Sequence, residues 1–267
     1  MTKNQPRPED ISGDDFQDLL NKYPALIESI STTKAGQKTL SELDEFRYEK
    51  APEQFRSQSP KRTMTHDDVK TLVDWKLRHG KFRPTLMKLV SSNDGGTVAD
   101  TIQQAMGAYW DEGQDASAAL AAICKLKGIG PATASLLLSV HDPERVIFFS
   151  DEAFWWLCCS GQKAPIKYNP KEYAELNQAA QALVQRLNVS ATAVEKVAYV
   201  IMKDEALPLT AVEKPKVTKK APSGKTPAES KTVDEVGSRR SSTKRKKEPR
   251  RDSPERPVRR SKRGKET

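Results

Sequence analysis

The chain has little of what a secreted, membrane-spanning or metal-binding protein needs. Its only cysteines are Cys124, Cys158 and Cys159, and their spacing matches no zinc or iron–sulfur site. So sparse and odd a set argues against a disulfide framework and for a reducing compartment. The N-terminus lacks the apolar core of a secretory signal, and no run approaches the roughly 20 apolar residues that span a bilayer. We therefore expect a soluble intracellular protein with no membrane partner, no metal and no cofactor.

Most of the chain has no net positive charge, and the excess of basic residues is concentrated at one end. Residues 208–267 hold 20 Lys and Arg against 8 Asp and Glu, whereas the preceding 207 residues hold 25 basic and 28 acidic side chains. The C-terminal stretch also has almost no aliphatic residues, so it cannot bury enough apolar surface to offset chain entropy. We predict a flexible N-terminus (1–12), a folded, slightly acidic body (13–207) and a disordered basic tail (208–267).

Two basic clusters stand out in the predicted tail, at 239–251 and 259–265. Clusters of this kind are recognised by the nuclear import machinery and bind nucleic acid without sequence preference. They predict a nuclear location, with import factors and DNA as partners. The alternative is a tail that only keeps the protein soluble.

The body is patterned almost entirely for helices. Thr65 is a predicted N-cap with Gly80 closing the same helix, and Pro170 suits a first helical turn. Apolar residues recur at helical spacing in 14–30, 65–80, 96–110, 115–126, 170–187 and 190–202. We predict an all-α body of about eight to ten helices.

Two stretches of the body lack a helical pattern. The segment RVIFF (145–149) is strand-like but has no partner run, so we expect an extended, buried connector. The segment APEQFRSQSPKR (51–62) is expected to be a long loop. Neither segment changes the predicted fold class.

A glycine-rich turn, LKGIGP (126–131), separates two of the predicted helices. Gly128 can take a positive φ, and Ile129 can anchor the turn between the helices. Gly130 has no Cβ, so another molecule can approach its backbone, and Pro131 suits the first turn of the next helix. Outward-facing amides would form an anion site for a nucleic-acid phosphate. The plainer interpretation is a tight corner between two helices.

The stretch LKGIGPATASLLLSV, followed by RVIFFSDEAFWWL, resembles the core of the helix-hairpin-helix DNA glycosylase superfamily. Over 73–93 together with the hairpin, the chain is similar to the eukaryotic Amun-like proteins, which are assigned as glycosylases. The resemblance implies a two-lobed helical fold with the helix-hairpin-helix motif at 115–140. It covers about 115–158 specifically, and elsewhere only the helical rhythm agrees.

The resemblance also implies roles for individual residues. Gly128 and Gly130 would bind phosphate, and Asp151 would stabilise the cationic sugar formed as an N-glycosidic bond breaks, a need shared with glycoside hydrolysis. Members that also cut the strand use a lysine two residues past the second glycine, where this chain has Ala132. Any base-excision activity would therefore be monofunctional.

Asp151 also has a purely structural explanation. Ser150 can cap a helix, and the helix dipole favours Asp151 and Glu152 in its first turn. A chain that kept this arrangement for stability alone would be a catalytically inactive chromatin-binding protein or a protein-interaction scaffold. Both alternatives stay open at this point.

Other residues are secondary candidates for the same site. Lys76, Arg83 and Lys127, with Ile129 in the turn, are candidate DNA contacts. Glu152, Trp155 and Trp156 are candidates for lining a pocket; the two tryptophans diverge by about 100° on a helix, so one is expected to be packed. We expect Trp75 in the core and His141 in a loop, and none of the three histidines has neighbours suggesting a metal site or triad.

Overall fold

The computed structural model describes residues 6–31, 36–111 and 113–203. Over these residues the protein is all-α and contains no strand, as predicted. The chain divides into two units, Met1–Val212 and Glu213–Thr267. The second unit lies outside the described residues, and so do both basic clusters of the predicted tail. None of the described helices is long and apolar enough to cross a bilayer.

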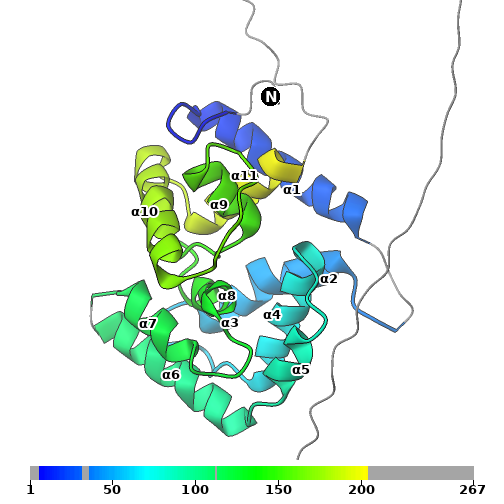
Figure 1. Cartoon of the computed structure of the whole chain (residues 1–267), viewed down its shortest axis with the longest axis vertical. Coiled ribbons are helices and arrows are strands. Elements are labelled where there is room, and N and C mark those ends of the chain that lie inside the picture. The colour runs from blue at the N-terminus through cyan, green and yellow to red at the C-terminus, as the bar shows by residue number, and fades with distance from the viewer. Residues whose placement is uncertain (1–5, 32–35, 112, 204–267) are drawn as a thin grey trace, which may run out of the picture. The chain divides into compact units, whose positions relative to one another are not determined.

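The described part of the first unit contains eleven α-helices and one π-helical turn (Figure 1). In chain order they are α1 (Gly13–Ile30), α2 (Leu40–Glu45), the π-helical turn η1 (Phe46–Lys50), α3 (Ala51–Phe55), α4 (His66–His79), α5 (Leu86–Ser91), α6 (Gly95–Asp111), α7 (Ala116–Ile123), α8 (Pro131–His141), α9 (Asp151–Cys158), α10 (Pro170–Leu187) and α11 (Ala191–Lys203).

Local capping chemistry explains where the longer helices begin. Thr65 caps α4 through a reciprocal pair: its hydroxyl accepts from the Asp68 N–H, and the Asp68 carboxylate accepts from the Thr65 N–H. Asn169 caps α10, with Pro170 in the first turn. These starts are those that the sequence predicts.

The predicted loop at 51–62 is wrong over its first five residues. Residues 51–55 form α3, which continues directly from η1, and the Ala51 N–H donates to Phe46 O in a π-type bond. Pro52 has no N–H to donate, so a wider turn ahead of it is tolerated. Burial of Ala51, Pro52 and Phe55 holds this segment in the core. Residues 56–62 are non-helical, as expected.

The described part of the N-terminus, residues 6–12, is held against the helices rather than free, unlike the flexible stretch that we expected. The Trp156 indole N–H donates to Pro6 O at 2.8 Å. The Arg186 guanidinium donates to Ile11 O at 2.9 Å, and Ile11 is buried.

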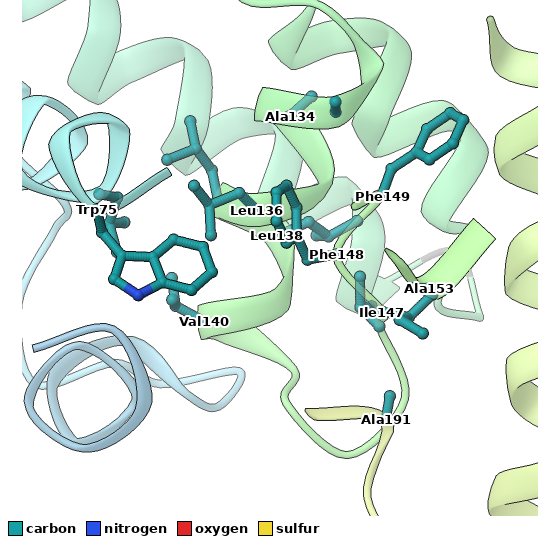
Figure 2. Close-up of a cluster of buried hydrophobic side chains, with 14 of the residues drawn as sticks. Trp75, Ala134, Leu136, Leu138, Val140, Ile147, Phe148, Phe149, Ala153 and Ala191 are labelled. Carbon is teal, nitrogen blue, oxygen red and sulfur yellow. The ribbon is translucent and has the colours of Figure 1, made fainter. Parts of the chain in front are cut away.

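The described helices form two groups of neighbours, and the buried helix α8 belongs to the second. Helices α1, α9, α10 and α11 pack against one another, and α4, α6, α7 and α8 form a second set of neighbours (Figure 1). From Ala132 to His141 every residue of α8 is buried. Figure 2 shows Leu136 and Leu138 of α8 within a buried cluster that also contains Trp75 and Phe148.

The extended connector after α8 places the start of α9. Val146 through Phe149 are buried, as the sequence predicts, and the Phe149 N–H donates to the Ser135 hydroxyl at 2.9 Å. This bond ties the connector to α8 just before Ser150. As a result α9 begins close to the N-terminus of α8. The glycine-rich turn 126–131, called the hairpin below, lies at the same place.

The expectation that His141 lies in a loop is wrong. His141 is the last residue of α8 and is buried, with Nδ1 2.8 Å from Leu137 O. Burial lowers its pKa to about 4. The helix continues to His141 because its ring packs against Phe55 of α3, a contact that local sequence does not reveal.

Candidate functional site

A cavity of about 280 Å³ opens between the glycine hairpin and the start of α9. Residues from four parts of the chain line it: the end of α4 through the turn to the start of α5, the hairpin with the first turn of α8, the connector with the start of α9, and Tyr168. Gly128, Gly130 and Asp151 all face this one space. The hairpin and the acid therefore share a cavity.

Steric constraints explain both glycines of the hairpin. Gly128 has φ +76°, and a Cβ there would lie 2.8 Å from Leu89 Cβ, so only glycine fits. Gly130 caps α8 with extended backbone, and a Cβ there would meet nothing within 4 Å. Gly128 is thus needed for packing, whereas the space beside Gly130 is open to another molecule.

The hairpin turn is longer than expected because α7 ends at Ile123, short of the predicted end. Asn93 holds this longer turn. The Lys127 N–H donates to Asn93 Oδ1 at 2.8 Å, and Asn93 Nδ2 donates to Lys127 O at 2.9 Å. Sequence inspection missed Asn93, because nothing local links it to a turn 34 residues away.

The backbone of the hairpin keeps donors available. Within the described residues, the N–H groups of Gly128 and Gly130 donate to no acceptor. Helix α8 begins without a side-chain cap, since Gly130 occupies that position. Free amides at a helix N-terminus attract anions.

Asp151 is the first residue of α9. Ser150 caps this helix by accepting from the Ala153 N–H at 3.0 Å, so the structural arrangement considered from sequence is present. The Asp151 carboxylate nevertheless faces the cavity and accepts a hydrogen bond from the Tyr168 hydroxyl. The helix cap at Ser150 therefore does not prevent the Asp151 carboxylate from facing the cavity.

Tyr168 is a site residue that the sequence did not reveal. It is half-buried, with φ +54°, and the Arg83 guanidinium carbon lies 5.2 Å from its ring centroid. Burial and the hydrogen bond to Asp151 raise the pKa of its hydroxyl. Tyr168 therefore stays a neutral donor to the carboxylate.

Lys76 reaches the cavity from α4. Its Nζ donates to Thr133 Oγ1, 2.7 Å away in the first turn of α8. Burial, with a smaller contribution from the positive charge of Arg83, lowers the pKa of Lys76 to about 8, although Asp151 acts in the opposite direction. The amine is therefore partly neutral near physiological pH.

His79, also missed from the sequence, is a buried residue that lines the cavity. Its ring stacks between Trp75 and Tyr199, with centroid distances of 4.4 and 3.8 Å. Burial, and then the positive charge of Lys203, hold its pKa well below the ordinary value. The imidazole is neutral, and Trp75 is buried in the core as predicted.

The pocket candidates on α9 separate into two kinds. Glu152 lines the cavity, but its carboxylate pairs with Lys203 Nζ at 2.9 Å. The indole N–H of Trp155 donates to Ala164 O at 2.7 Å, and Trp156 is buried under the N-terminal segment. Neither tryptophan lines the cavity.

The structure brings together most of the residues singled out from sequence. Those that line the cavity are Lys76, Arg83, Gly128, Gly130, Asp151 and Glu152. Those that do not are Lys127, Ile129, Trp155 and Trp156. Ile129 is buried in the hairpin as the expected anchor, while Lys127 is exposed. In the described part of the chain no three His, Cys, Asp or Glu residues are grouped to hold a metal ion.

No protein-family model matches the chain, and the comparisons with curated proteins and with solved structures likewise give no match.

Proposed function

We propose that the helical body is a DNA-binding domain of the helix-hairpin-helix glycosylase type, which removes a base from DNA by N-glycosidic cleavage. The observation that carries the proposal is the shared cavity: Gly128, Gly130 and Asp151 line the same space. A phosphate held at the hairpin would leave its neighbouring sugar within that space.

Local charge favours phosphate at this cavity although the body is slightly acidic. Lys76, Lys81 and Arg83 line it together with Gly128 and Gly130, whose N–H groups donate to no acceptor within the described residues. Clustered positive charge raises the local concentration of an anion whatever the net charge of the domain. Backbone contacts of this kind hold DNA without reading its sequence.

The exposed aromatic ring of Phe82 supports a nucleic-acid partner. Its side chain is 67 % exposed between two cations of the cavity wall, Lys81 and Arg83. An exposed aromatic flanked by cations suits stacking on a base while the cations meet the backbone. Stacking there would also help to hold a duplex from which one nucleotide has been displaced.

Asp151 would act on the sugar of the displaced nucleotide. As the bond between base and C1′ breaks, positive charge develops on the sugar, and the carboxylate stabilises it. The base leaves with the electrons of that bond, water adds to C1′, and the proton that the water loses ends on the departed base, so an abasic sugar results. Ala132 leaves the position two residues past the second glycine without an amine, so the activity derived from Gly128, Gly130 and Asp151 alone is monofunctional.

The runner-up is a chromatin-binding or scaffold protein without chemistry. The Tyr168 hydroxyl favours it, because this group already occupies the Asp151 carboxylate. In either case the basic tail would add nonspecific DNA affinity and address the protein to the nucleus through import factors.

The test is base release from duplex oligonucleotides, each carrying one of a panel of damaged bases. Full-length protein is incubated with each duplex, and alkali then cleaves the strand at abasic sites. We expect Asp151→Asn to lower the rate by at least about a hundredfold. The control is Asp100→Asn, which removes an exposed acid from α6. Equal rates for wild type and Asp151→Asn, or binding without release for the whole panel, would favour the runner-up.

A further inference from the structure

We propose that Lys76 is a nucleophilic amine of this cavity, which condenses with the aldehyde of an abasic deoxyribose to form an imine. The inference rests on the proposed function, because the abasic sugar is the product of base removal. It names the next group that the same site would act on: a sugar aldehyde beside a phosphodiester.

The position of Lys76 carries the inference. It lies between the buried residues Trp75 and Leu77, so α4 fixes its backbone. Its Nζ reaches across to Thr133 Oγ1, one residue beyond Ala132. The amine of Lys76, which comes from α4, thus lies near Ala132, the position where strand-cutting members of the superfamily have a lysine.

The surroundings of Lys76 favour a reactive amine. Phe148 and Phe149 contribute to the same cavity and limit its hydration, and the charges acting on Lys76 are those of Arg83 and Asp151. With a pKa of about 8, about a fifth of the amine is neutral at pH 7.4, against about one part in a thousand for an ordinary lysine. Only the neutral form is a nucleophile.

The chemical step balances without an oxidant or reductant. The nitrogen lone pair attacks C1′ of the open-chain sugar, and a proton moves from nitrogen to the former carbonyl oxygen. Loss of one water then gives the imine. Asp151 faces the same cavity and can carry the proton from the nitrogen to the departing hydroxyl.

The test uses full-length protein and a duplex with one abasic site, in the presence of sodium cyanoborohydride. This reagent reduces an imine to a stable secondary amine, so the protein is trapped on the DNA. Peptide mapping by mass spectrometry then identifies the modified lysine, which separates Lys76 from the many other lysines of the chain. Wild type is compared with Lys76→Arg, which keeps a cation able to donate to Thr133 but cannot form the imine.

We expect the wild-type adduct on Lys76, and a loss of at least about tenfold in trapped product for Lys76→Arg. Lys70→Arg is the matched control, because Lys70 lies on the same helix but pairs with Asp67 outside the cavity. The trapping rate on Lys76 should rise from pH 6.5 and begin to level off above pH 8, because its pKa is about 8. The rate on a lysine of ordinary pKa would instead keep rising about tenfold per pH unit up to pH 8.5. Adducts confined to other lysines would overturn the inference, even if Lys76→Arg fails to fold.

A second duplex separates this inference from the proposed function. A duplex with a tetrahydrofuran abasic analogue has the phosphates but no aldehyde. Its affinity therefore reports phosphate binding at the hairpin without imine formation. If Gly130→Ala weakens binding but no adduct forms on Lys76, imine formation is overturned and phosphate binding at the hairpin is supported. Equal affinity of wild type and Gly130→Ala for this duplex would overturn phosphate binding at the hairpin. The adduct on Lys76 is measured in the separate trapping experiment.

Discussion

Asn93 and Lys127 are joined by two hydrogen bonds, one in each direction between the side-chain amide of Asn93 and the backbone N–H and C=O of Lys127. They link the segment after α5 to the hairpin before α8. Because a turn without regular structure has few other bonds, these two fix its shape.

Replacing Asn93 with alanine should therefore loosen the hairpin. Loss of both bonds to Lys127 should destabilise the fold by about 1–2 kcal/mol and, by the proposed function, weaken DNA binding. Thermal unfolding and fluorescence anisotropy measure the two effects. Ser92→Ala is the neighbouring control, since its hydroxyl bonds only within its own helix end. Unchanged affinity in Asn93→Ala would show that hairpin shape does not matter for binding.

Alanine substitutions at the two hairpin glycines should have different effects, one on the stability of the fold and the other on DNA affinity. Gly128→Ala forces a Cβ against Leu89 at a positive φ, and we expect a loss of about 1–3 kcal/mol in the free energy of unfolding. Gly130→Ala meets open space, so the unfolding free energy should hardly change. The added methyl would instead obstruct a phosphate and lower DNA affinity by about tenfold. Urea titration and anisotropy at fixed salt test the pair; full affinity in Gly130→Ala would argue that the hairpin is only a corner.

Phe82 should contribute to DNA affinity without contributing to the core. Phe82→Ala removes a mostly exposed ring, so stability should stay within about 0.5 kcal/mol of wild type. Loss of stacking should lower affinity about tenfold. Ile30→Ala is a control, because Ile30 is another exposed apolar residue and does not line the cavity. An equal effect of both changes would indicate general hydrophobic loss rather than stacking.

Acid should destabilise the body through His141. Its pKa is about 4 in the fold because of burial, against about 6.5 when unfolded, so below pH 6.5 the unfolded chain binds the extra proton. Its effect on stability is therefore nil above pH 6.5 and grows as the pH falls to about 4, at about 1.4 kcal/mol per pH unit. Urea titrations at pH 7 and pH 5 measure the difference.

The variant His141→Gln removes that titration and should flatten the pH dependence relative to wild type. His79, whose pKa is also lowered by burial, keeps its own contribution in both proteins. An identical pH dependence in wild type and variant would mean that His141 is protonated without cost in the fold.

Sequence alone predicted the parts of this protein that depend on near neighbours. The caps at Thr65 and Asn169 join residues three apart, and the positive φ of Gly128 is a property of one residue. Such interactions repeat in many proteins with the same local pattern, so the helices and the glycine-rich turn between two of them could be predicted. The same reasoning failed at α3, where burial overrides the loop-like composition.

Tertiary structure decided what the cavity contains. Lys76 and Thr133 are 57 residues apart, and Tyr168 and Asp151 are 17 apart on different elements. No spacing rule links such pairs; they meet because α8 is buried between its neighbours and the connector returns α9 to the hairpin. The amine and the tyrosine beside the acid follow from that packing, since the folded chain alone fixes distances between remote residues.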